Sequence, residues 1–227
     1  MNSFSFFVKQ PIEFAWSEFK KKGFFWILVS LVPVLPFLPL LIAVPLLVFG
    51  LSLPSVSDIA VMVGIPTMAV LLLGAFIFSL FFQGGLMKMT LAAVDGKQIS
   101  AGDFFRVSPS VILNFALTMI IYSVLVAAGL ILFIVPGIYL AIKYGYAGYF
   151  ALDKGYGPIR AFKESGRITQ GVKWDVFLLW HFLGFLSAVG GYFFVVGLFV
   201  TMPISLLVMA WTYRNLEQKA APASSEV

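Results

Sequence analysis

The sequence predicts an all-α, polytopic membrane protein with six transmembrane helices and cytoplasmic amphipathic helices at the membrane interface. Of its 227 residues, 61% are hydrophobic and only 11% are charged, which is too few for the surface of a soluble domain of this length. The apolar runs are long and continuous rather than alternating. This pattern favours helices over the strands of a membrane β-barrel.

The positions of the basic residues predict the topology. The fifteen Lys and Arg residues lie in four clusters, at 9–22, 88–106, 154–173 and 214–219, apart from Lys143. Enough apolar sequence lies between consecutive clusters to cross a bilayer and return. If the N-terminus is cytoplasmic, fourteen of the fifteen basic residues face inward, as the positive-inside rule requires. We therefore expect a multi-pass protein of the bacterial cytoplasmic (inner) membrane with both termini in the cytoplasm.

Six spans follow from these apolar runs. They lie at about 23–50, 59–82, 110–133, 138–152, 174–191 and 193–213. Together they form a single predicted membrane domain over 1–215. The remaining residues, 216–227, form an Ala- and Ser-rich tail that is predicted to be disordered.

Two of the spans are unusual. The first contains four prolines between 33 and 45, so we expect a kinked or locally broken helix with that face buried against protein. The fourth is short and rich in tyrosine, and it is preceded by a predicted reversal at 135–137. A tyrosine-rich segment of this kind is typical of a tilted helix or of the wall of a polar cavity.

Three cytoplasmic segments are predicted to form amphipathic helices. In residues 4–20, Phe side chains share one broad arc that suits the acyl boundary, and Pro11 bends or interrupts the helix. The segment 100–107 begins with Ser100 as a helix N-cap. The third helix begins at Gly157-Pro158, because proline is well tolerated in the first turn.

Five residues are candidates for contact with a lipid or another ligand: Lys143, Tyr139, Arg160, Lys163 and Arg167. A cation inside a span is costly, so Lys143 is a functional hypothesis by default; it can instead snorkel to the external headgroups or form a structural pair. The three α-helically spaced cations can bind anionic lipid headgroups, or they can stay solvated and serve topology alone. Pairing with Glu164 or Asp175 would weaken the lipid interpretation.

Other polar or small residues in the spans have structural and functional interpretations. His181 can relay protons or form a hydrogen bond to a neighbouring helix. Asn114 and Gln83 are typical of interhelical hydrogen bonding, and the small residues between 184 and 191 favour close helix packing. A three-unit repeat is also visible, in which Pro11-Ile12 corresponds to Pro158-Ile159. Duplication and the ordinary layout of helical hairpins both explain it.

No catalytic motif, His-rich metal cluster or cysteine occurs in the sequence, so no enzyme activity, cofactor or metal is predicted. One histidine and few carboxylates leave little for acid–base catalysis. The net charge of +5 is explained by the positive-inside rule and by contact with anionic lipid headgroups, and nucleic acid is not an expected partner.

A distinctive pattern runs from residue 136 to residue 174. It comprises PGIY at 136–139, Asp153, GPIRAFKES at 157–165, RITQG at 167–171 and Trp174. It resembles the uncharacterised bacterial integral membrane families related to the membrane domain of glycerophosphoryl diester phosphodiesterases, including YciC-like and DUF975-like proteins. The resemblance is best over residues 84–180 and implies a six-helix bundle, in which Lys143 matches a position that often holds a cation. It implies no activity here, because in those enzymes the activity resides in a separate soluble domain.

We therefore expect a non-enzymatic integral membrane protein that engages anionic lipids or a membrane partner protein in envelope homeostasis. The alternative is a transporter of a small solute or lipid that uses the first span and the region of Tyr139 and Lys143. A membrane-embedded enzyme is the third interpretation. A transporter requires a polar cavity near the midplane, whereas a lipid-binding protein predicts a packed interior with lateral grooves.

Overall fold

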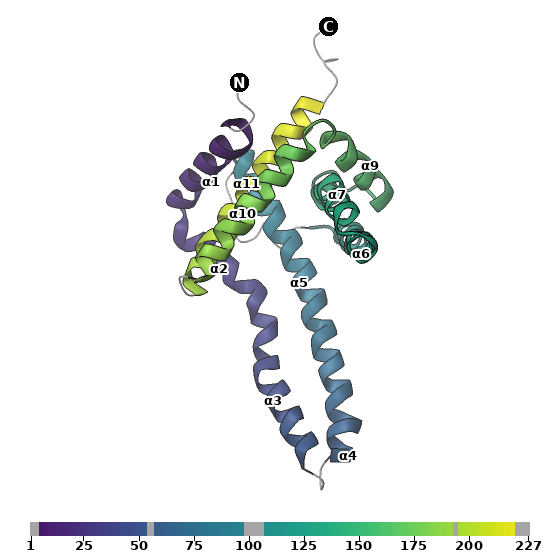
Figure 1. Ribbon diagram of the computed structural model, residues 1–227. Helices are drawn as coiled ribbons and strands as arrows, with labels where there is room; N and C mark the ends of the chain where they lie inside the picture. The colour runs from purple at the N-terminus through teal and green to yellow at the C-terminus, as the bar shows by residue number, and fades with distance from the viewer. Residues whose placement is uncertain (1–4, 54–56, 98–106, 193–194, 221–227) are drawn as a thin grey trace. The chain divides into compact units, whose positions relative to one another are not determined.

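The computed structural model describes residues 5–53, 57–97, 107–192 and 195–220, and every regular element in these ranges is helical (Figure 1). Four stretches are long and apolar enough to cross a membrane: Gly23–Ser52, Ala60–Val94, Pro109–Leu132 and Lys173–Tyr192. The all-α membrane class is confirmed at this level. The predicted fourth and sixth spans are not among these four. The predicted helix at 100–107 lies, but for its last residue, outside the described ranges.

The contacts divide the chain into two compact units. Unit 1 comprises Met1–Ser30 and Gly84–Val227, and unit 2 comprises Leu31–Gln83. Helix α5 (Ile65–Val94) contributes to both units, because the division falls within it. The sequence predicts one domain over 1–215 and gives no sign of this division into two units.

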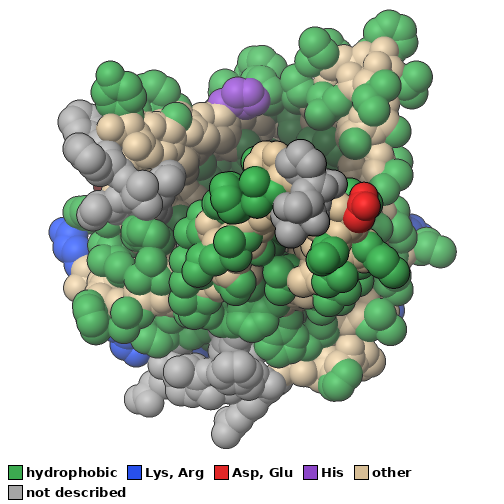
Figure 2. Space-filling view, turned by 90° about the horizontal axis from the view of Figure 1, so that it is seen from below, with side chains coloured by type: hydrophobic (Ala, Val, Ile, Leu, Met, Phe, Trp, Pro, Cys, Tyr) green, Lys and Arg blue, Asp and Glu red, His purple; other side chains and the backbone are tan. Residues whose placement is uncertain are grey.

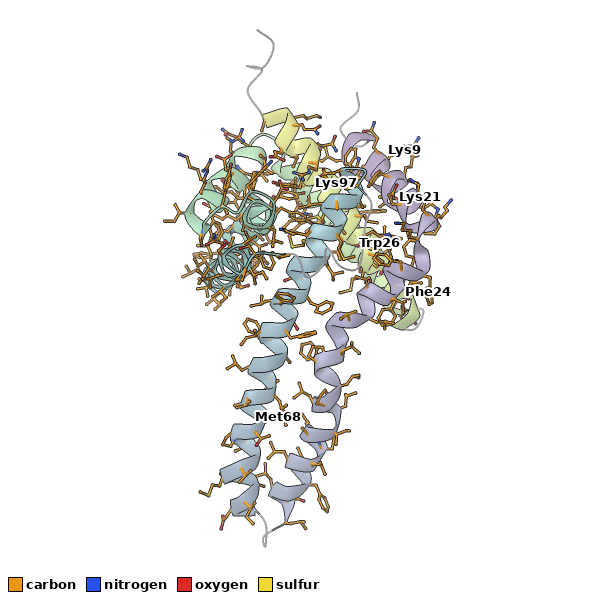
Figure 3. All side chains as sticks on the ribbon, turned by 180° about the vertical axis from the view of Figure 1, so that it is seen from behind. Lys9, Lys21, Phe24, Trp26, Met68 and Lys97 are labelled. Carbon is orange, nitrogen blue, oxygen red and sulfur yellow. The ribbon has the colours of Figure 1, made fainter. Side chains whose placement is uncertain are left out.

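Unit 2 is a pair of long apolar helical stretches. It contains the 3-10 helix η2 (Val32–Phe37), α3 (Leu38–Ser52), α4 (Ser57–Ile59), the π-helix η3 (Ala60–Gly64) and the first part of α5. The predicted break in the first span is confirmed at η2, which contains Pro33 and Pro36, since proline lacks the donor that an α-helix needs. The predicted burial of this span is wrong for α3, which has no buried residue. Carbon-rich side chains line α3 and the part of α5 around Met68 (Figure 3).

The N-terminal helices belong to unit 1. They are the π-helix η1 (Ser5–Lys9), α1 (Gln10–Lys21) and the start of α2 (Gly23–Leu31). Helix α1 is amphipathic, but Pro11, Ala15 and Phe19 on its apolar side are buried, and α1 packs on α11 (Val195–Ala220). The expectation that this face rests in the acyl boundary is therefore corrected, because the face is covered by protein. Lys21 projects away from it (Figure 3).

Helices α6 (Pro109–Leu132) and α7 (Ile134–Tyr144) form a tight hairpin in unit 1. The chain reverses at Phe133, whose backbone is extended (φ −158°, ψ 139°), and not at 135–137 as the sequence predicts. Gly137 lies instead in the first turns of α7. A Cβ there would lie 2.6 Å from the backbone nitrogen of Leu130, so the close approach of the two helices requires glycine.

The predicted fourth span, 138–152, is two helices rather than one. Helix α7 ends at Tyr144, and α8 (Ala147–Lys154) begins after a turn at Gly145 and Tyr146. A Cβ on Gly145 would overlap the ring of Trp180 in α10 (Lys173–Tyr192), so glycine lets α10 pack against the turn. The sequence shows one apolar run here, but tertiary contacts divide it.

The core of unit 1 is aromatic and surrounds α8. Tyr146, Tyr149 and Phe150 are all at most 3% exposed. The ring centroid of Tyr213 on α11 lies 5.2 Å from that of Tyr149 and 5.0 Å from that of Phe150. Two of the tyrosines predicted to sit at an interface or cavity are therefore core residues, whereas Tyr139 is 45% exposed. Helix α11 continues to Ala220, so residues 216–220, predicted to be disordered, are helical.

Candidate functional site

Helix α9 (Pro158–Ile168) begins after Gly157 as predicted, and it packs on α7 and α8 where these two helices meet. The Ser165 hydroxyl donates to the carbonyl of Lys143 at 2.9 Å and accepts a hydrogen bond from the backbone N–H of Tyr146 at 3.2 Å. The Thr169 hydroxyl lies 3.2 Å from the same carbonyl and 2.9 Å from that of Ser165, and its one hydrogen is shared between them. These hydroxyls bind backbone groups at the break, where a continuous helix would otherwise supply the partners. They fix α9 beside Lys143.

This packing brings three of the five predicted contact residues into one groove of about 550 Å³. We call it the cationic groove and define it by Lys143, Tyr144, Lys163, Glu164 and Arg167. Lys163 and Arg167 lie about one turn apart on α9, and Lys143 comes from α7, twenty residues before Lys163. All three cations line one surface. Gly166 leaves room for the lysine stem, because a Cβ there would lie 3.3 Å from Lys143 Cε.

The position of Lys143 bears on its two sequence interpretations. Its ammonium lies 4.8 Å from the ring centroid of Tyr144 and 6.0 Å from that of Tyr139, within range of cation–π attraction. Its stem lies against α9, the helix predicted to be cytoplasmic. Lys143 therefore cannot snorkel to the external headgroups if α9 is cytoplasmic, so those two predictions do not hold together.

The charges of the cationic groove differ in how far they are neutralised. Arg167 Nε donates to Glu164 at 2.7 Å, and Arg167 Nη1 donates to the carbonyl of Ala220 at the end of α11. The pairing that would weaken a lipid interpretation is thus present for Arg167. Within the described residues, neither Lys143 nor Lys163 has a carboxylate partner, so their positive charge is available to a ligand.

The other two predicted residues flank this groove. Arg160 lines the next groove along α9, where its guanidinium carbon lies 3.8 Å from the ring centroid of Tyr156. Tyr139 lies close to both Lys143 and Lys173, with its ring centroid 6.0 Å from Lys143 Nζ and 4.8 Å from Lys173 Nζ. All five predicted residues therefore lie along one face built from α7, α9 and the start of α10.

A polar cluster that the sequence analysis missed joins the ends of α5, α8 and α11. Arg214 donates to Asp95 through Nε at 2.8 Å and Nη2 at 2.9 Å. It donates to Asp153 through Nη1 at 2.6 Å and Nη2 at 2.8 Å, and Nη1 also donates to Glu217 at 3.2 Å. Lys154 Nζ lies 2.8 Å from Glu217 and 3.3 Å from Asp153. All five donors of the Arg214 guanidinium are used, so the residue is a clamp between helices.

The clamp also sets the ionisation of its members. Burial alone would raise the pKa of the Asp153 carboxyl, but hydrogen bonding and attraction to Arg214, with help from Lys154, hold that pKa below its ordinary value. Burial opposes the charge of Arg214, but the hydrogen bonds to Asp153 and Asp95 raise its pKa. Both partners are therefore charged at neutral pH. A cavity of about 270 Å³ beside the clamp is lined in part by Lys88 and Lys97.

The remaining polar candidates have local partners. Asn114 of α6 donates through Nδ2 to the carbonyl of Gly155, just after α8, at 3.3 Å, so its predicted interhelical role is confirmed. His181 Nδ1 lies 2.9 Å from the carbonyl of Phe177 one turn earlier in α10, so this contact is within its own helix rather than to a neighbour. Gln83 is exposed.

Comparison with known proteins gives distant relatives only. No family model and no solved structure matches the chain. The uncharacterized proteins Rv2560 of Mycobacterium tuberculosis (strain ATCC 25618 / H37Rv) and Mb2590 of Mycobacterium bovis (strain ATCC BAA-935 / AF2122/97) are each 28% identical to it over 146 residues. The match covers 62% of this chain and 43% of each relative, so the chain spans less than half the length of the curated relatives it matches.

Neither relative's name states an activity or a ligand, so the resemblance to the phosphodiesterase-related membrane families stays a prediction. The sequence, the helices and the comparisons together describe a helical protein with four candidate membrane spans that is similar, over part of its length, to mycobacterial proteins.

Proposed function

We propose that this chain is a non-enzymatic, multi-pass protein of the bacterial cytoplasmic membrane that binds anionic lipids through the cationic groove and serves the upkeep of the cell envelope. The observation that carries the proposal is the convergence of Lys143 from α7 with Lys163 and Arg167 from α9 on one open surface. Both termini are cytoplasmic in this proposal, as the basic clusters favour.

The charge of the groove supports a phosphate-bearing ligand. Its walls carry three cations and one carboxylate, Glu164, so its net charge is +2. Glu164 is committed to Arg167 at 2.7 Å, which leaves the two lysines to meet a phosphate. Each basic residue near an anionic membrane surface contributes about 1 kcal/mol to binding, and the contribution falls with salt.

The surroundings of the groove support a lipid rather than a free solute. Ile159 lines the groove and is 88% exposed although it is hydrophobic. Hydrophobic side chains also dominate the face of the molecule seen from below in Figure 2, as expected where lipid covers a protein. Arg167 contacts Ala220, so the groove opens near the polar end of α11 that also holds Arg214. Tyr139 and Tyr144 lie beside Lys143, and tyrosine favours the level of the headgroups.

The packing of the interior supports lipid binding over transport. A transporter would use the tyrosines of 138–152 to line a polar cavity, but Tyr146 and Tyr149 are buried in the aromatic core. The cavities around the predicted contact residues are open grooves on the side of α9.

The six-crossing topology is part of the proposal. Helices α7 and α8 both pack along α6, so together they return the chain as a broken fourth span, and α11 forms the sixth. The cysteine-free chain allows a direct test with single substitutions. Asp58→Cys and Lys163→Cys should react with a membrane-impermeant thiol reagent from opposite sides of the membrane, and labelling of both from one side would contradict the topology.

Lipid binding is tested by removing the two unpaired charges. We expect Lys143→Gln with Lys163→Gln to weaken binding of phosphatidylglycerol about 30-fold, since two contributions of about 1 kcal/mol are lost. Binding is measured by native mass spectrometry on the purified protein, with phosphatidylcholine as the zwitterionic reference. The matched control is Lys9→Gln with Lys20→Gln, which removes the same charge from η1 and α1. An equal loss in the control, or none in the test pair, would overturn the proposal.

A further inference from the structure

A second groove is also lined by α7. It has a volume of about 320 Å³ and lies between α7 and α10. Its walls are apolar side chains: Val135, Ile138 and Ile142 from α7, and Trp174 and Phe177 from α10. We call it the apolar groove. The ring of Trp174 stacks on that of Phe177 with centroids 5.0 Å apart, so the α10 wall is a continuous aromatic surface.

Tyr139 lines the apolar groove and lies close to cations of both grooves. Its ring centroid is 4.8 Å from the ammonium of Lys173 and 6.0 Å from that of Lys143. Lys173 also lines the apolar groove, and Lys143 lines the cationic groove. One end of the apolar groove is therefore marked by positive charge, and its other walls have almost no polar surface.

The apolar groove is open at Val135 and Trp174 and is closed at its base by the buried Ile142. Val135 is 77% exposed and Trp174 is 69% exposed, although both are large hydrophobic side chains. Such walls offer water no hydrogen-bond partners, and a hydrated solute would lose its own hydrogen bonds there. An occupant that satisfies both the charged end and the apolar walls must be an anion attached to a hydrocarbon chain.

We infer that the two grooves form one site for a single anionic phospholipid, with its phosphate bound by Lys143 and Lys173 and an acyl chain in the apolar groove along Val135 and Phe177. The inference rests on the proposed lipid binding and deepens it, because it names the part of the lipid that each groove holds. It adds the apolar groove and Lys173 to the site. The ring of Tyr139 lies within cation–π range of both ammonium groups and helps to place them.

The test separates the chain from the headgroup. Three lipids are compared by native mass spectrometry: long-chain phosphatidylglycerol, its dihexanoyl form, and long-chain phosphatidylcholine. The first variant, Val135→Trp, fills the open end of the apolar groove; the second, Trp174→Ala, removes part of its wall. The control is Ile131→Trp, because Ile131 is 85% exposed on α6 and does not line the groove.

We expect both groove variants to bind long-chain phosphatidylglycerol with about tenfold lower affinity than the wild type. Each methylene group returned to water changes the affinity about fourfold. Dihexanoyl phosphatidylglycerol should bind the variants and the wild type equally. The control variant should bind both forms of phosphatidylglycerol with the affinity of the wild type. A photoreactive acyl chain should label residues 135–142 or 173–177 in the wild type. The label at these positions should be lost in Val135→Trp.

Each contrary outcome has a separate meaning. If the groove variants lose equal affinity for long-chain and dihexanoyl phosphatidylglycerol, the acyl-chain inference is wrong and headgroup binding stands. The same conclusion follows if Ile131→Trp has the same effect as the groove variants. If the photoreactive chain labels only other surfaces, the inference is likewise wrong. If wild-type protein binds phosphatidylcholine as well as phosphatidylglycerol, the proposed function itself fails.

Discussion

Removal of the Ser165 hydroxyl is the sharpest test of how the cationic groove is assembled. This side chain is fully buried and connects α9 to both sides of the break between α7 and α8. In Ser165→Ala the carbonyl of Lys143 keeps the hydroxyl of Thr169, which donates to it at 3.2 Å. The backbone N–H of Tyr146 loses its acceptor and is left buried.

The size of the effect follows from that one orphaned donor. A buried polar group without a partner costs about 1–3 kcal/mol, and the loss of a single oxygen leaves little room for a cavity term. For a chain of this size, 1 kcal/mol lowers the melting temperature by about 2–4 °C, so we expect a decrease of about 2–12 °C.

The assay is unfolding of the purified protein in detergent micelles, by thermal melting and by titration with a denaturing detergent. The matched control is Ser123→Ala, because the Ser123 hydroxyl is exposed and donates only to the Met119 carbonyl one turn back, at 2.9 Å. A surface change of this kind alters stability by no more than about 0.5 kcal/mol. If the two variants lose equal stability, Ser165 does not hold the break, and the account of the groove is wrong.

Three further outcomes follow from the structure. Arg214→Lys should lower the free energy of unfolding by about 2–3 kcal/mol in the same titration, because an ammonium cannot serve Asp95 and Asp153 with paired hydrogen bonds. Asp153 has a lowered pKa in the fold, so its contribution is present above its unfolded pKa of about 3.9 and is lost as pH falls through its folded pKa. Stability measured against pH should therefore be level from pH 8 to 5 and fall below about pH 4, less steeply in Asp153→Asn. The Gly145→Ala variant should have a free energy of unfolding lower by about 1–3 kcal/mol, because its added methyl group overpacks against Trp180. Adding Trp180→Leu to this variant should recover part of the lost stability.

Local chemistry in the sequence was sufficient to predict several elements. Gly157-Pro158 marks the start of α9 because the fixed φ of proline suits a first helical turn, and the prolines of the first span mark the 3-10 segment at Val32–Phe37. The spacing of Arg160, Lys163 and Arg167 likewise predicted their common exposed face. These features depend on neighbours within one or two turns.

The features that the sequence missed depend on distant contacts. The run 138–152 contains no proline and only one charged residue, Lys143, so its pattern does not mark the break, which is set by Ser165 on α9 and Trp180 on α10. The clamp was missed because the basic residue at 214 has an ordinary topological explanation. A signal was nevertheless present: Asp95, Asp153 and Glu217 each follow an apolar segment at the predicted cytoplasmic side, where Arg214 also lies.

The Arg214 clamp has a consequence for the order in which the protein matures. Asp95 is 119 residues before its partner, and Asp153 is 61 residues before it. At about 5–20 residues per second, synthesis leaves Asp95 without that partner for about 6–24 s. Throughout this interval Arg214 is not yet present to join the ends of α5 and α8. Before residue 214 is made, the only cations that pair with Asp95 and Asp153 within the described residues are the neighbouring Lys97 and Lys154. Emergence of residue 214 is therefore the event that first joins the ends of α5 and α8 through one side chain.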